Sequence, residues 1–129
     1  MLRSLMATAM FLSLGATEVI AQDASCVEAA KTIDDVVNCG NVVVPAIEER
    51  INKEFNRIAE KYKNNDEMQT MIRLTKDSWS NYRNIQCNFE GDSAADGQTR
   101  GALPVKGQKA FLGCVVRTLH QMESALSKL

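Results

Sequence analysis

The sequence has 129 residues, a formal net charge of −1 and 24% charged residues, as expected for one globular domain. It has no basic face of the kind that binds nucleic acid, and no cluster of Lys and Arg that would attract an anionic membrane. These properties argue against two function classes and leave enzymes, binding modules and structural proteins open.

Residues 1–21 have the pattern of a secretory signal peptide. Arg3 gives a short positive start, an apolar run extends from Leu5 to Ala16, and small or apolar residues precede a cleavage site between Ala21 and Gln22. The run is too short for a membrane span. A lipoprotein signal needs a Leu-like residue three places before the lipidated cysteine, and Asp23 occupies that place before Cys26. We therefore expect residues 22–129 to form a periplasmic or secreted domain with no membrane attachment.

Four cysteines follow the predicted cleavage site. An even number of cysteines in a small exported chain indicates two disulfides. Their gaps of 12, 47 and 26 residues and the single His120 do not fit a zinc site, so we expect no metal and no cofactor. Three pairings are possible. Cys26–Cys39 with Cys87–Cys114 is favoured because each bridge closes a shorter loop, but the sequence alone leaves the pairing open.

A short first helix is expected to begin at Ser25, which opens a capping-box pattern, and to break at residues 38–41. Thirteen steps of unbroken helix span about 20 Å, whereas bridged Cα atoms lie within about 7 Å. A Cys26–Cys39 bridge therefore requires a bend, which we place near Thr32, where a second capping signal begins.

Two long helices are expected next, joined by a short connection that makes them an antiparallel hairpin. The first has Pro45 as its first residue and ends at Asn64–Asn65; the second opens at Asp66. We expect the domain to be built around this second helix, which holds the only Trp. The apolar stripe of the first is Ile47, Ile51, Phe55, Ile58 and Tyr62, and that of the second is Met68, Ile72, Trp79, Tyr82 and Phe89.

Residues 90–107 are glycine-rich and lack apolar periodicity, so they are expected to form a long loop. Its acidic residues Glu90, Asp92 and Asp96 are the candidate partner-binding residues, with an ordinary solvated loop as the alternative. A last helix is expected from about Gln108 to Lys128. Its stripe is Leu112, Val115, Leu119, Met122, Leu126 and Leu129. The predicted fold class is all-α, a small disulfide-stapled bundle of about four helices.

No set of residues predicts catalysis. His120 is expected to face water, with no nucleophile placed beside it. The adjacent pairs Asp34–Asp35 and Glu48–Glu49 point about 100° apart on a helix, which favours solvated faces over paired catalytic carboxyls. Arg83 is expected to stack on Trp79 or to pair with carbonyls at a helix end, with a ligand grip as the alternative. We do not expect an enzyme.

The segment from Trp79 to Cys87, which reads Trp-x-x-Tyr-Arg-x-x-x-Cys through Tyr82 and Arg83, resembles the LprI-type lysozyme inhibitor family of small exported bacterial domains. Ile51-Asn52-x-x-Phe55 is similar to the family's Leu-Asn-x-x-Tyr, and Cys114 matches its later cysteine. The remaining residues, which look like the family's opening array, are Cys26, Ala29, Thr32, Asp35 and Cys39.

The resemblance implies a protein partner, most simply a lysozyme-type cell-wall hydrolase that the domain inhibits. An acidic loop would suit a basic lysozyme, although a net charge of −1 gives weak global steering. Two alternatives stay open. One is a periplasmic envelope factor that binds peptidoglycan or another protein. The other is an immunity protein against a peptidoglycan amidase.

Overall fold

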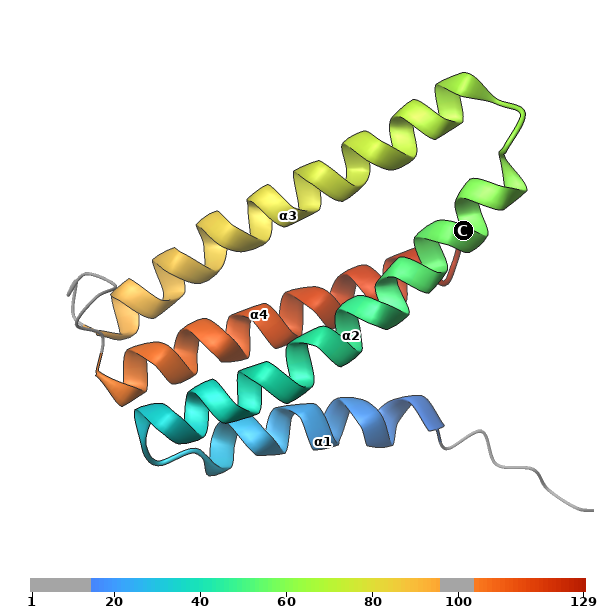
Figure 1. The fold of residues 1–129 in the computed structure, drawn as a ribbon. Coiled ribbons are helices and arrows are strands. Elements are labelled where there is room, and N and C mark those ends of the chain that lie inside the picture. Colours follow the sequence, from blue (N-terminus) through green and yellow to red (C-terminus); the bar gives the residue numbers. More distant parts are fainter. Residues whose placement is uncertain (1–14, 96–103) are drawn as a thin grey trace, which may run out of the picture.

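The computed structural model describes residues 15–95 and 104–129, and the side chains within them from Gln22 onward. They form four helices, α1 (Gly15–Ala29), α2 (Ile33–Lys61), α3 (Asp66–Ala94) and α4 (Val105–Leu126) (Figure 1). The all-α prediction is confirmed. No helix in these two ranges is both long and apolar enough to cross a membrane.

Helix α4 is the centre of the bundle. It packs against all three other helices, and α2 and α3 each contact α4 far more than they contact each other. The expectation that the Trp79 helix organises the domain is wrong, since only Cys87 and Gly91 of α3 are buried. Leu129 is exposed, contrary to its predicted place in the α4 stripe. The buried apolar residues of α4 include Leu112, Val115, Val116, Leu119, Met122 and Leu126.

The bend near Thr32 that the sequence predicted is confirmed. Thr32 caps α2: its Oγ1 accepts a hydrogen bond from the Asp35 N–H, and the Asp35 carboxylate accepts from the N–H groups of Lys31 and Thr32. The predicted helix start at Ser25 is wrong. Ser25 lies inside α1, where its Oγ donates to the Gln22 carbonyl, a back-bond that serine makes within helices. Helix α1 also spans the predicted cleavage bond.

Helix α2 continues through the predicted break at residues 38–41 and through Pro45, which is not its first residue. Its buried residues recur on every turn across this region, at Val36, Cys39, Val43 and Ile47. Pro45 removes one hydrogen bond to the Asn41 carbonyl, and both residues lie on the exposed side. Continuous packing therefore outweighs the local breakers. The rest of the predicted stripe is confirmed as buried to Ile58 and partly buried at Tyr62.

Helix α3 is capped by Asn65, whose side-chain oxygen accepts from the Met68 N–H, and it runs to Ala94. The predicted loop at 90–107 is therefore wrong at both of its ends, because α4 already begins at Val105. Ile72 and Trp79 are partly buried against the core. Tyr82 and Phe89 are exposed, contrary to prediction. Figure 1 shows α3 at the edge of the bundle, where one of its sides has no neighbouring helix among the described residues.

Candidate functional site

The two disulfides pin each helix to a neighbour. Figure 1 shows that the α1–α2 connection and the C-terminal end of α3 lie at the end of the bundle opposite the α2–α3 turn. Cys26–Cys39 joins α1 to α2 over a sequence separation of 13, and Cys87–Cys114 joins α3 to α4 over a separation of 27. The pairing with the shorter loops is therefore confirmed, and all four cysteines are bridged. Cys87 and Cys114 are fully buried, so this second bridge belongs to the core.

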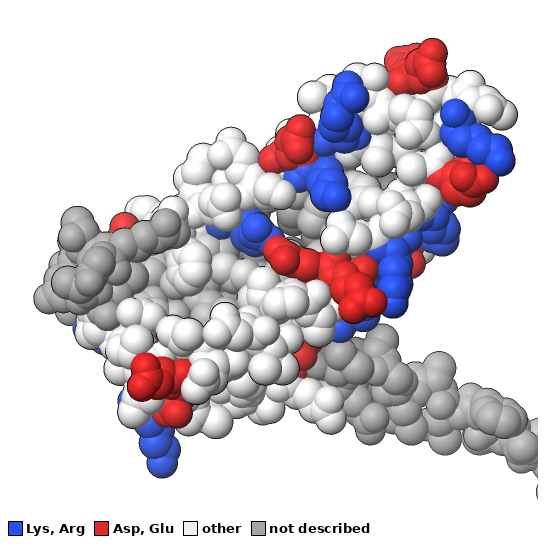
Figure 2. Space-filling model, viewed as in Figure 1, with Lys and Arg blue, Asp and Glu red and all other residues white. Residues whose placement is uncertain are grey.

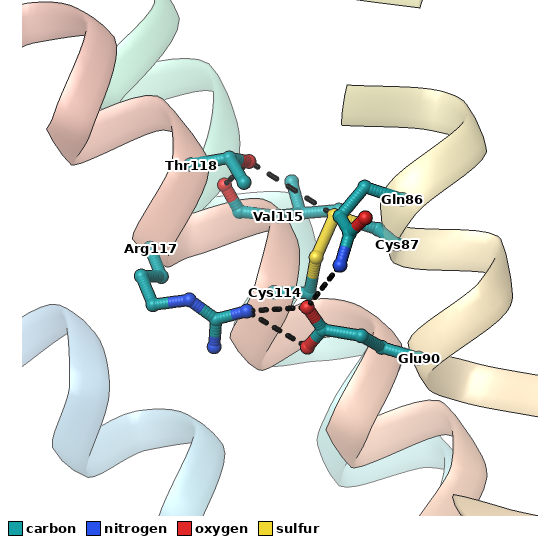
Figure 3. The surroundings of a disulfide bond; sticks show 7 residues. All are labelled: Gln86, Cys87, Glu90, Cys114, Val115, Arg117 and Thr118. Atoms are coloured by element: carbon teal, nitrogen blue, oxygen red, sulfur yellow. Dashed lines mark hydrogen bonds and ion pairs between the residues drawn. A yellow bond between two sulfur atoms is a disulfide. The ribbon is translucent and has the colours of Figure 1, made fainter. Parts of the chain in front are cut away.

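Glu90 lies directly beside the Cys87–Cys114 bridge (Figure 3). Nη2 of Arg117 lies 2.7 Å from each of its two carboxylate oxygens, and Gln86 Nε2 donates to it at 2.9 Å. The hydrogen bond from Arg117, assisted by that from Gln86, lowers the pKa of Glu90 below its usual range. Glu90 therefore fastens α3 to α4, and its charge is already partnered.

A groove with a volume of about 910 Å³ runs between α1 and α3, with α4 as its floor. The floor combines small side chains of α4 with longer ones, among them Arg117, His120 and Lys128. The exposed ring of Phe89 lies in the α3 wall, and Cys114 ties the floor to that wall through its disulfide. Sequence reasoning missed this groove because it is formed by three helices that are distant in sequence. The small floor residues are Ala110, Gly113, Ser124 and Ala125.

A polar cluster beside the groove fastens α1 to α2 and α4. His120 is only 9% exposed, with its Nε2 3.0 Å from Asp23 Oδ2 and its Nδ1 3.4 Å from Glu123 Oε2, although neither contact has hydrogen-bond geometry. Arg50 Nε lies 2.6 Å from Glu123 Oε1, and Arg50 Nη2 lies 3.7 Å from Asp23 Oδ2. The hydrogen bond to Glu123 raises the pKa of Arg50. The expectation that His120 faces water is wrong, because α1 covers that side of α4.

The three acidic residues predicted to bind a partner do not form a loop surface in the structure. Glu90 and Asp92 lie in α3, and Asp96 lies outside the described residues. Asp92 is half-buried, and its Oδ1 has no hydrogen-bond partner among the residues described. The one sequence signal that α3 continues through Glu90 was the 3–4 spacing of Cys87, Glu90 and Gly91. This spacing extends the face of α3 that meets α4.

The residues that carry the family resemblance have structural contacts. Trp79 is partly buried, and its ring meets Tyr82 edge to face, with centroids 6.2 Å apart. Arg83 Nη1 donates to Glu48 Oε1 at 3.1 Å and so links α3 to α2. This carboxylate partner is neither the Trp79 ring nor the helix-end carbonyls that we expected from the sequence.

The other carboxylates weighed as catalytic pairs have separate roles. Asp35 caps α2, and the backbone hydrogen bond from Lys31 lowers its pKa most. Glu49 lies 2.9 Å from Lys53, whose hydrogen bond lowers the pKa of Glu49. Neither pair converges on a common point. Figure 2 shows acidic and basic side chains interspersed over the α2–α3 hairpin.

Within the described residues, no three His, Cys, Asp or Glu side chains come together as a metal site. No family model, curated protein or solved structure matches the chain.

Proposed function

We propose that this chain is an exported binding protein that holds a protein partner in the α1–α3–α4 groove, and that a lysozyme-type cell-wall hydrolase is the partner to test first. The groove is the observation that supports binding. The sequence resemblance supports the class of partner. The disulfides support export, since such bridges form and persist in oxidising compartments.

The groove suits a protruding side chain or loop of another protein. Its volume of about 910 Å³ is that of a site for a sizeable group. Ala and Gly on the floor let a partner approach the α4 backbone closely, and Phe89 offers a large aromatic surface of the kind found at binding hot spots. Cys87–Cys114 ties the α3 wall to the floor, and Cys26–Cys39 ties the α1 wall to α2, which packs on α4. Both bridges restrain the walls, which lowers the ordering cost of binding.

The acidic residues are a weaker basis for recognition than the groove. Because Arg117 already neutralises Glu90, that carboxylate gives little attraction for a basic hydrolase. With a net charge of −1, long-range steering is also weak. We therefore expect the affinity to depend on the shape of the groove and to change little with salt.

The test is a titration of lysozyme activity with the oxidised protein and two matched variants. Ala125→Arg puts a long cation on the groove floor, and Asn56→Arg makes the same charge change at an exposed α2 position outside the groove. We expect inhibition by the wild type and by Asn56→Arg, and its loss in Ala125→Arg. Equal inhibition by both variants would place the contact elsewhere.

Failure of the wild type to inhibit, with both disulfides formed, would refute the lysozyme assignment. The same three proteins then serve in a pull-down with purified peptidoglycan and in an amidase assay. Binding there that is lost only in Ala125→Arg would keep the groove as the site and change the partner.

A further inference from the structure

The outer face of α3 carries an apolar stripe that nothing in the described chain covers. Its five large side chains are between 52% and 67% exposed, and Ser78 interrupts the row. The spacing of positions 71, 74 and 78 is repeated eleven residues later at positions 82, 85 and 89. An eleven-residue period returns to within about 20° on a straight α-helix, so all six positions form one line. The large side chains are Met71, Leu74, Tyr82, Ile85 and Phe89.

The stripe is also free of charge along its length. At 100° per residue, every charged residue between positions 71 and 89 lies about 100° or more around the helix axis from the centre of the stripe. Two of these residues point toward α2, where Lys76 Nζ donates to Asn52 and Arg83 donates to Glu48. A charge-free apolar row on an otherwise charged helix is the pattern of a helix that packs against a partner helix.

We propose that α3 pairs with α3 of a second copy of this chain, antiparallel and about a two-fold axis. The stripe is self-complementary in this arrangement, as a two-fold interface requires. Antiparallel pairing sets Met71 opposite Phe89 of the second copy and Leu74 opposite Ile85. The small Ser78 then faces the bulky Tyr82, so that each gap receives a ring.

The size of the stripe fits this partner. It runs from position 71 to position 89, which is 18 helical steps or about 27 Å. With roughly 100 Å² exposed on each large side chain, the row offers about 500 Å², the size of the largest apolar patch on a typical monomer, which is often a functional surface. Polar residues beside it bring the contact toward the roughly 800 Å² per chain of a standard interface. Like charges, Glu67 and Asp92, meet only at the two ends, where water screens them.

The experiment measures molar mass by light scattering and sedimentation for the oxidised wild type and for two single variants, Leu74→Glu and Ile85→Lys. The wild type is expected at twice the chain mass, with the dimer dissociating on dilution. Each variant is expected at the mass of one chain with unchanged helicity. Val42→Lys is the control, since it changes an exposed apolar residue on α2 and leaves the dimer intact.

Mixing the two single variants tests the direction of pairing. In an antiparallel pair the introduced Glu at position 74 meets the introduced Lys at position 85, so the mixture forms a heterodimer. A parallel pair would bring neither together, and the mixture would stay monomeric, which overturns the proposed geometry.

A wild type that stays monomeric at its solubility limit overturns the pairing without needing any variant to fold. Neither Leu74 nor Ile85 lines the groove, so these variants leave its lining unchanged. Phe89 belongs both to the stripe and to the groove wall, so pairing would cover its ring.

Discussion

The two disulfides are expected to stabilise the fold unequally. In the chain-entropy model a bridge stabilises by restricting the unfolded chain, more so for a longer closed loop. The separation of 27 for Cys87–Cys114 corresponds to about 3.6 kcal/mol, and the separation of 13 for Cys26–Cys39 to about 2.9 kcal/mol. Removing Cys87–Cys114 also takes sulfur from two fully buried positions, which leaves a cavity and makes the loss of this bridge more costly.

Two double variants test this order by thermal unfolding followed by circular dichroism. For a domain of this size, a loss of 1 kcal/mol lowers the Tm by about 4 °C. Replacing Cys87 and Cys114 by Ala should therefore lower the Tm by roughly 15 °C. Replacing Cys26 and Cys39 by Ala should cause a smaller decrease. Reductant should lower the wild-type Tm more than either pair of substitutions does. A larger loss from the Cys26–Cys39 pair, or an unchanged Tm in reductant, would refute the reasoning.

Three further predictions concern side chains that join helices. Ile47→Ala, at a fully buried site, should cost about 2–5 kcal/mol of unfolding free energy in urea, whereas Val42→Ala on the surface should stay within about 0.5 kcal/mol. Because Arg117 lowers the pKa of Glu90, the ionised carboxylate stabilises the fold at pH values above the ordinary glutamate pKa of 4.5. This contribution is lost as the pH falls through the lowered pKa. Glu90→Gln should therefore make the free energy of unfolding fall less steeply with decreasing pH. Arg50→Met removes the two side-chain hydrogen bonds that the partly buried Glu123 accepts from Arg50 and should cost about 1–3 kcal/mol. A Tm equal to the wild type would contradict the cluster's role.

The elements with strong local signals were predictable from sequence. The stripe of α2 from Ile47 to Ile58 has helical spacing and is buried as expected. The bend at Thr32 followed from two independent constraints, the capping signal and the distance that a Cys26–Cys39 bridge can span. The disulfide pairing was favoured by loop length alone, and the structure confirms it.

The misplaced side chains share one cause, which is that spacing reveals an apolar face but not what covers it. The 3–4 pattern of α3 is real, yet its Tyr82 and Phe89 face outward, because α4 packs on a different side, at Cys87 and Gly91. His120 was misplaced for the converse reason, since α1 covers a part of α4 that looks polar in sequence. The groove and the cluster around Arg50 depend on the tertiary arrangement of helices and could not be derived from any one segment.

The most direct test of the account is the end point of the hydrolase titration with fully oxidised wild-type protein. One groove per chain predicts that activity falls linearly and is abolished at one chain per hydrolase molecule. It also predicts that the reduced protein loses this effect as its groove walls separate. Activity that persists at a large molar excess of folded, oxidised protein would contradict the proposal that this chain inhibits a lysozyme-type enzyme.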